Sequence, residues 1–300
     1  MSNSPGKALT LPNNTTQTPA VTRGGVRVAL SLDLMASELR VMFTRRRTWA
    51  MLAAIALIPI LLAIAVYLSS DRLAPGEGPP FVDRVTQNGL FTGFAAMLLA
   101  MPLFLPLTVS VVSGDTIAGE AGLGTLRYLL IAPVGRLRLL VIKYLGTLAF
   151  VVAGTMILML AGALIGWLLF PVGPVTLLSG DVIGIGESLW RMTLVALYTT
   201  ISMTGMLAIG LFISTLTTIP VGAMTGVLIT SGVSQILDNL PQLSAIHPWL
   251  FTHYWLDFAD ILRAPIELSS LGSNALLQLG YVALFGALAY GRLASKDVLS

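Results

Sequence analysis

The chain has 300 residues, of which 55% are hydrophobic and only 10% are charged, and its formal net charge is +3. A soluble domain of this length needs far more charge to cover its surface, so the composition excludes an ordinary globular protein. Cysteine is absent, which excludes disulfides, thiolate metal sites and cysteine nucleophiles. The apolar residues come in blocks of membrane-spanning length, so we expect an all-α polytopic membrane protein.

The first 25 residues differ from the rest of the chain. They are polar, contain Pro5, Pro12 and Pro19, and lack the apolar core of a signal peptide. This composition predicts a disordered cytoplasmic tail.

Residues 26–47 have apolar side chains at helical spacing and end in Arg45, Arg46 and Arg47, with Trp49 close behind. Arginines beside a tryptophan, just before an apolar run, are typical of a helix lying in the membrane interface. We therefore predict an interfacial amphipathic helix over 26–47, with these four side chains as its anchors. The alternative is a soluble cytoplasmic helix.

The remaining residues, 48–300, are expected to form a six-span transmembrane domain. Within the second span, Pro102 and Pro106 each remove a backbone hydrogen bond and predict a bend. Small-residue pairs in the third and fifth spans allow helices to approach closely, and dimerisation is one use of such pairs. The pairs are Gly162/Gly166 and Gly222/Gly226. The expected spans are 48–68, 90–112, 139–170, 191–216, 220–237 and 271–291.

Lysine and arginine are distributed unevenly between the two sides of the membrane. With six spans, thirteen of the 17 lie on the side of the two termini and of the segment between the second and third spans. The other side holds Arg72, Arg84, Arg191 and Arg263. Since cytoplasmic loops carry the excess of positive residues, both termini are expected in the cytoplasm.

The segment 113–137 is a polar, glycine-rich and basic interruption between two apolar runs. Four glycines, at 114, 119, 122 and 124, predict a pliable backbone that a partner can approach closely. Pro133 is expected to end a short helical piece, because the residue before proline avoids helical angles. We predict a short cytoplasmic helix and turn between the second and third spans. An ordinary connecting loop with anchoring arginines is the alternative.

This segment carries the pattern D-x-I-A-G-E-x-x-x-G-T-L-R-x-L-L-x-x-P-V-x-R-x-x-L-L-x-x-K, which resembles the hallmark of permease subunits of the type-2 family of ABC exporters. The matching residues are Asp115, Ile117, Ala118, Gly119, Glu120, Gly124, Thr125, Leu126, Arg127, Leu129, Leu130, Pro133, Val134, Arg136, Leu139, Leu140 and Lys143. The layout resembles the family too, as does Pro248-Trp-Leu-Phe-Thr-His-Tyr254 before the last span. The chain departs from many relatives at 121–123, where they carry charged residues.

The resemblance implies that the segment contains a coupling helix, which docks on a separate ATP-hydrolysing subunit. The residues expected to couple to that subunit are Asp115, Ile117, Gly119, Glu120, Gly124, Thr125, Leu126, Arg127, Pro133 and Arg136. Two ATPase copies would bind ATP and Mg²⁺, beneath a pair formed with a second copy of this chain or with a similar permease. The three lysines, at 7, 143 and 296, belong to no phosphate-binding loop, so we expect no catalysis by this chain.

The segment 238–270 is expected to form an external cap over the translocation pathway, with His247, Trp249, His253 and Tyr254 as its candidate residues. Its interleaved aromatic residues are typical of an aromatic belt or a half-inserted helix. The alternative is a metal site, since His253, Asp257 and Asp260 have the spacing of one helix face. We expect no metal.

These observations predict an exporter permease in the plasma membrane of a bacterial cell, moving an apolar or amphipathic drug, lipid or peptide out of the cytoplasm or inner leaflet. Extraction of a lipid, or help in maturing an extracellular enzyme, would use the same machinery. The main alternative is an ATPase-independent secondary transporter or channel. It predicts ionisable residues in the middle of the membrane, and the sequence places none there clearly. A membrane-embedded enzyme would need convergent ionisable residues, which only the residues around His253 offer.

Overall fold

The computed structural model describes residues 23–69, 80–124 and 135–295. Among these residues, six helical segments are long and apolar enough to cross a membrane: Arg46–Ser69, Phe91–Gly122, Arg136–Leu169, Ile185–Leu216, Pro220–Asp238 and Leu268–Ser295. The prediction of an all-α polytopic membrane protein with six spans is therefore confirmed.

The described elements follow one another in the order helix, span and short connection. Their bounds are α1 Arg23–Thr44, α2 Arg46–Ser69, α3 Pro80–Gln87, α4 Phe91–Leu99, η1 Ala100–Phe104, α5 Leu105–Gly122, α7 Arg136–Leu169, β1 Val175–Thr176, β2 Val182–Ile183, α8 Ile185–Leu216, α9 Pro220–Asp238, η2 Pro241–Leu243, η3 His247–Trp249, η4 Trp255–Leu262 and α10 Leu268–Ser295. The two short strands pair antiparallel, with Val175 opposite Ile183.

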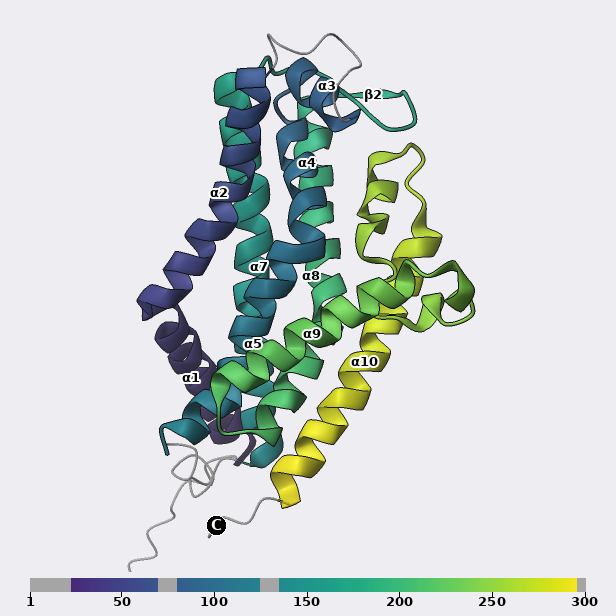
Figure 1. Cartoon of the computed structure of the whole chain (residues 1–300). Coiled ribbons are helices and arrows are strands. Elements are labelled where there is room, and N and C mark those ends of the chain that lie inside the picture. The colour runs from purple at the N-terminus through teal and green to yellow at the C-terminus, as the bar shows by residue number, and fades with distance from the viewer. Residues whose placement is uncertain (1–22, 70–79, 125–134, 296–300) are drawn as a thin grey trace, which may run out of the picture.

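The long helices run side by side along one axis, with α7 packed against α2, α4 and α8 (Figure 1). Helix α8 also packs against α5 and α10. Helix α9 crosses the bundle obliquely and lies on α5 and α8 (Figure 1). Both α1 and the last turn of α10 lie at the end of the bundle opposite α3 and β2.

Several helix boundaries differ from the expected ones. The first helix begins at Arg23 and ends at Thr44, so its start lies inside the segment expected as a disordered tail. Residues 1–22 lie outside the described part of the chain. The second span continues to Gly122, ten residues beyond the expected end, and therefore includes half of the polar segment 113–137. The polar residues at the end of α5 find partners on other helices, and these contacts favour the helix over a loop.

The second span contains a π-helical turn, η1, between α4 and α5. Pro106 has no N–H to donate to the carbonyl of Pro102, four residues earlier. The side chain of Gln235 on α9 donates to that carbonyl instead, over 3.0 Å. The bend predicted from the two prolines thus has a specific neighbour that satisfies its exposed backbone.

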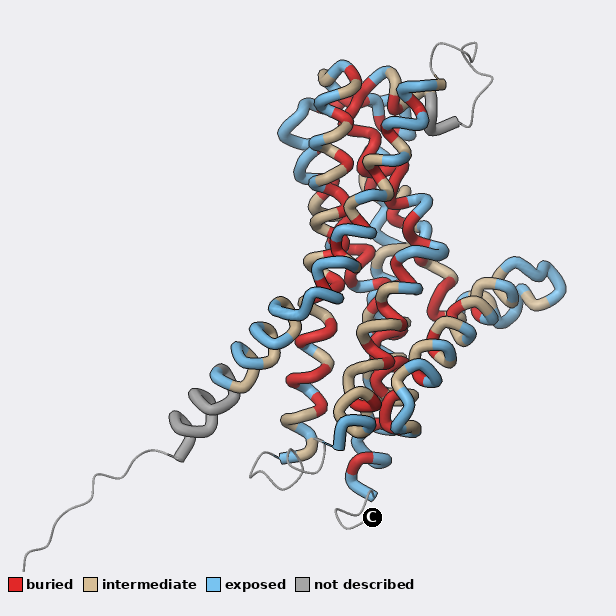
Figure 2. Tube along the Cα trace, turned by 60° about the vertical axis from the view of Figure 1, so that its left-hand side comes forward, coloured by how far each residue is buried: buried red, intermediate tan, exposed pale blue. Residues whose placement is uncertain are grey.

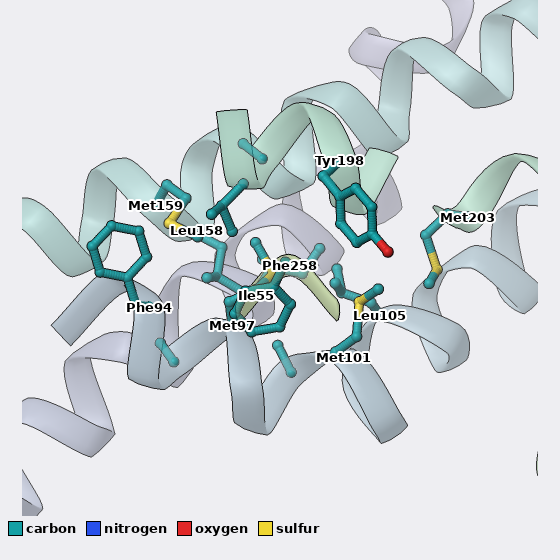
Figure 3. Close-up of a cluster of buried hydrophobic side chains, with 14 of the residues drawn as sticks. Ile55, Phe94, Met97, Met101, Leu105, Leu158, Met159, Tyr198, Met203 and Phe258 are labelled. Carbon is teal, nitrogen blue, oxygen red and sulfur yellow. The ribbon is translucent and has the colours of Figure 1, made fainter. Parts of the chain in front are cut away.

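The core is a column of apolar side chains inside the bundle. Figure 3 shows its central part, where methionines and aromatic rings from α4, α7 and α8 meet Ile55 of α2 and Phe258 of η4. Burial is concentrated along this column, while the outer helix faces are exposed (Figure 2). Many exposed residues are large and apolar, including Leu61, Leu160 and Leu276. Such a surface fits a lipid environment.

Helices α4 and α7 touch through their backbones. A Cβ atom added at Gly162 would lie 2.5 Å from the Cα of Gly93, and one added at Gly166 would overlap the carbonyl of Gly89. The Gly162/Gly166 pair is therefore used inside the chain, against the second glycine pair Gly89/Gly93. Gly222 has no such neighbour within 4 Å, so its pair is open toward the outside.

Candidate functional site

Asp115 joins α5 to the junction between α1 and α2. Its Oδ2 atom lies 3.0 Å from Nη1 of Arg47 and 3.8 Å from Nη1 of Arg45. Arg47 also donates through Nη2 to the carbonyl of Val111, at 3.3 Å. Two of the four predicted membrane anchors therefore bind the second span. They fix the α1–α2 junction against the end of α5.

The other two predicted anchors are exposed. Arg46 projects outward, and Trp49 donates from Nε1 to the carbonyl of Phe43 at 2.8 Å. The indole thus satisfies one of the free carbonyls at the end of α1. An amphipathic tryptophan that is exposed beside an arginine is typical of an interfacial residue, and the position of this junction in a membrane remains a prediction.

Lys143 joins α7 to α1 and α5. Its Nζ atom donates to both carboxylate oxygens of Glu38, at 2.9 Å each, and makes a short contact with Glu120. The lysine side chain is only 7% exposed, while both carboxylates are about one-fifth exposed. Because charges out of water are costly unless paired, this cluster is highly sensitive to loss of the lysine.

These charged side chains line a small cavity between α1, α2 and α5. Its volume is about 120 Å³, which is well below the roughly 300 Å³ of the smaller ligand pockets in proteins. Arg47, Asp115 and Glu120 all belong to its wall. The cavity has room for a few water molecules, so this end of the molecule is a mechanical junction rather than a substrate site.

Arg136, at the start of α7, holds the end of α10. Its Nη1 atom donates to the carbonyl of Leu293 at 3.1 Å and makes a short contact with that of Ala294. An arginine on the last carbonyls of a helix satisfies groups that have no partner within that helix. The contact connects the third span to the sixth.

The remaining predicted coupling residues have different surroundings. Ile117 is buried beside Leu140, Leu211 and Ala289. Gly119 lies inside α5, where a Cβ atom would come within 2.6 Å of the Asp115 carboxylate. Gly114 and Gly122 also lie within α5, so the expected pliable loop is wrong for this part. Gly124 has the positive φ of +71° that favours glycine. Thr125, Leu126, Arg127 and Pro133 lie outside the described residues.

The segment 238–270 contains three 3₁₀ helices, and side chains of neighbouring helices bind its backbone. Tyr198 donates to the carbonyl of Tyr254 at 2.5 Å. Gln278 donates to that of Phe251 at 2.8 Å, and Tyr281 to that of the exposed Trp249 at 2.8 Å. Trp255 donates in return to the carbonyl of Ser202, which lies near the middle of α8. The expected external cap therefore lies beside the middle of α8.

His253 binds Asp238 at the end of α9, with 2.6 Å between Nδ1 and Oδ1. The ring of His247 lies 6.0 Å from that of His253. Asp260 instead pairs with Arg263 at 3.3 Å, so the expected one-sided His–Asp–Asp helix face is wrong. In the described part of the chain no three such side chains converge on a metal position. The pair does place ionisable groups level with the middle of α8, where the sequence had indicated none.

The pH dependence of stability tests the environment of Asp257. Burial, followed by the charge of Asp260, raises the pKa of this carboxyl above its ordinary value, while His253 lowers it and Asp238 adds a smaller increase. A raised carboxyl pKa means that the stability it contributes is present below about pH 4 and is lost as the pH rises through the folded-state pKa.

Asp257→Asn is therefore expected to raise the melting temperature of the purified chain at pH 7.5 and to change it little at pH 4. Thermal unfolding in detergent would measure this, with the exposed Asp33→Asn as the control. An equal effect of Asp257→Asn at both pH values would contradict the assignment.

Sequence reasoning missed Glu38 as a member of this site and did not include Lys143 among the coupling residues. Glu38 lies on a helix predicted to contact only the membrane surface, 105 positions before its partner. One signal was present, because Lys143 is the sole lysine between residues 8 and 295 and follows a largely apolar run. A lysine that enters a span in this way needs a nearby carboxylate.

Comparison with protein families gives one match. A family model described as "ABC-2 family transporter protein" matches residues 32–298, which is nearly the whole chain. A search of curated proteins finds no significant match. The matched range includes α1, all six spans and the segment 238–270.

Proposed function

Since the chain belongs to the ABC-2 family of transporter proteins and is a membrane permease subunit of an ABC transporter, we propose that it exports an apolar or amphipathic substrate, such as a drug, lipid or peptide. A separate ATPase, present in two copies, binds ATP and Mg²⁺ and supplies the energy. The permease works as a pair, with a second copy of itself or a similar chain. Its termini and the segment between α5 and α7 face the cytoplasm of a bacterial cell.

One observation carries this proposal: the two ends of the coupling segment are attached to most of the bundle. At its start, Asp115 binds Arg47 and Glu120 contacts Lys143. At its end, Arg136 holds the last turn of α10. A force applied between these ends would therefore reach α1, α2, α7 and α10 together. This arrangement is what a subunit that converts a partner's movement into transport requires.

The polarity of one face supports a paired arrangement. Half-exposed Asp238 and His253 lie level with the middle of α8, next to exposed Asn239. Ionisable groups at membrane depth almost always face a bundle interior or a water-filled cavity. A second permease placed beside α9 would enclose them along a shared pathway, and the apolar surroundings would suit an amphipathic cargo.

The same pair favours the second candidate function, a secondary transporter, because a histidine–aspartate pair at this depth is suited to proton movement. The two candidates differ in their dependence on ATP. Purification of the tagged chain from its native membrane tests them. An ATPase recovered in about equal amount supports the exporter, while transport without ATP by the chain alone would overturn it.

The docking surface can be tested at Leu123, the last residue but one of the described chain before the coupling segment's undescribed part. This large apolar side chain is 79% exposed at the end of α5. We expect Leu123→Arg to reduce recovery of the ATPase about tenfold, equivalent to roughly 1.4 kcal/mol of binding free energy, since charge disfavours an apolar contact.

The melting temperature of the Leu123→Arg permease itself should not change, because the side chain has few contacts to lose. Val182→Arg is the matched control, since Val182 is 65% exposed on β2 at the opposite end of the bundle. Recovery of the ATPase at wild-type levels with Leu123→Arg, or equal loss with Val182→Arg, would argue against docking at this end.

A further inference from the structure

Ser214, in the last turn of α8, makes three hydrogen bonds to one turn of α5. Its Oγ atom donates to the carbonyl of Gly114 at 2.7 Å. It accepts from the backbone N–H groups of Ala118 at 2.8 Å and Ile117 at 3.0 Å. A hydroxyl has one hydrogen and two lone pairs, so its bonding capacity is completely used here. The side chain is fully buried, and water does not compete for these contacts.

Two glycines allow this approach. A Cβ atom at Gly210, one turn before Ser214, would overlap the Ser113 hydroxyl. A Cβ atom at Gly114 would lie 2.7 Å from the backbone nitrogen of Met224 on α9. The turn 113–118 of α5 is thus held against α8 and α9 without intervening side chains. Close backbone contact of this kind lets a displacement of one helix act directly on the next.

Nearby hydroxyls do not form such contacts. Ser110 and Ser113 donate to carbonyls of their own helix, α5, and Thr215 donates to a carbonyl of α8. Bonding within the helix is the usual arrangement for a hydroxyl in an apolar bundle. Ser214 instead uses its hydroxyl between helices, at the same turn of α5 that carries Asp115.

Ser214 also lies next to the connection between α8 and α9. Helix α8 ends at Leu216 and α9 begins at Pro220. The α5 end approaches that connection as well, since a Cβ atom at Gly122 would be 2.9 Å from the Thr218 carbonyl. A shift of the α5 end therefore acts on α9 at its first turn, from which the oblique helix extends toward Asp238.

We propose that Ser214 is a positioning residue that transmits movement of the α5 end to α8 and α9. This proposal rests on the proposed function, in which an ATPase moves the coupling segment. Asp115 and Glu120 receive the movement together with α1, α2 and α7, and the Ser214 hydroxyl passes it to the helices that carry the polar face. The ion pairs and the hydroxyl thus act on opposite sides of the same turn of α5.

Hydrogen exchange of the chain alone tests the contact without any ATPase. Ser214→Ala removes the hydroxyl, and we expect amides in peptides covering 114–122 to exchange roughly fivefold faster. Ser110→Ala is the matched control, because it deletes a buried hydroxyl that bonds only its own helix. Unchanged exchange in Ser214→Ala, or the same increase in Ser110→Ala, would overturn the contact as a specific link.

The transmission itself is tested in the complex with the co-purified ATPase. The absence of cysteine allows spin labels to be attached only at Leu61→Cys on α2 and Ile236→Cys on α9, both exposed positions. Singly labelled samples identify distances between copies. A non-hydrolysable ATP analogue should shift the α2–α9 distance in the otherwise unchanged chain and in Ser110→Ala, but not in Ser214→Ala.

ATP hydrolysis and ATPase recovery should remain within about twofold of the wild type in Ser214→Ala, which a general loss of folding would not allow. A full distance shift in Ser214→Ala would overturn the proposal, as would the absence of any shift in the unmodified complex. If no ATPase is recovered at all, the proposed function fails, whereas the hydrogen-exchange result still decides whether the Ser214 contact exists.

Discussion

Gly166→Leu is expected to abolish the folded bundle. Even a Cβ atom at this position would overlap the Gly89 carbonyl and lie 2.8 Å from the Thr92 hydroxyl, and leucine adds three further carbons. Helices α4 and α7 would have to separate along their full contact, which also holds the column of core side chains. Overpacking usually costs about 1–3 kcal/mol, and overlap with a rigid backbone belongs above that range. We expect no monodisperse protein in size-exclusion chromatography.

Gly222→Leu is the matched control for this prediction. Gly222 also begins a pair of glycines four residues apart, but it has no neighbour within 4 Å inside the chain. The expected melting temperature of Gly222→Leu is close to that of the wild type. A stable, monodisperse Gly166→Leu would show that α4 and α7 do not touch through their backbones.

Lys143→Met is expected to lower the free energy of unfolding by about 3 kcal/mol, because it leaves the carboxylates of Glu38 and Glu120 close together without their shared cation. Methionine has a similar length and suits an apolar span, so lost packing is a minor part of the effect. The midpoint of unfolding in a denaturing-detergent titration would measure the change.

The triple variant Lys143→Met with Glu38→Gln and Glu120→Gln separates charge from shape. It removes every charge of the cluster and keeps the side-chain volumes, and replacing a complete buried ion cluster is often neutral or stabilising. We expect its midpoint to return to near the wild-type value. A triple variant as unstable as Lys143→Met would mean that the lysine acts through packing and not through its charge.

Much of the fold could be predicted from the sequence, because membrane spans depend on local composition. Each apolar block corresponds to a helix, and the bend at Pro102 and Pro106 follows from their missing N–H groups. The end of α5 could not be predicted in this way. Its run of glycine and charged residues has the composition of a loop, and it is helical because Arg47, Lys143 and Ser214 satisfy its polar groups.

The site was predicted less well than the fold. The motif correctly singled out Asp115, Glu120 and Arg136 as unusual, yet their contacts depend on helices that a single sequence cannot pair. Arg47 lies 68 positions from Asp115, and the Arg136 partner Leu293 lies 157 positions away. The irregular segment 238–270 was assigned to the surface because of its aromatic residues. Its depth depends on hydroxyl and amide groups of α8 and α10, such as Tyr198 and Gln278, that have no distinctive local pattern.

The glycine contact between α4 and α7 also governs how the chain is assembled during synthesis. Gly162 and Gly166 emerge from the ribosome 69 and 73 positions after Gly93. At about 5–20 residues per second, α4 waits roughly 3–15 seconds in the membrane with its glycine face uncovered. During that interval the nascent protein is open to misassembly and degradation, and lipid or a membrane chaperone must shield the face. Translation through α7 therefore decides whether the first half of the molecule survives.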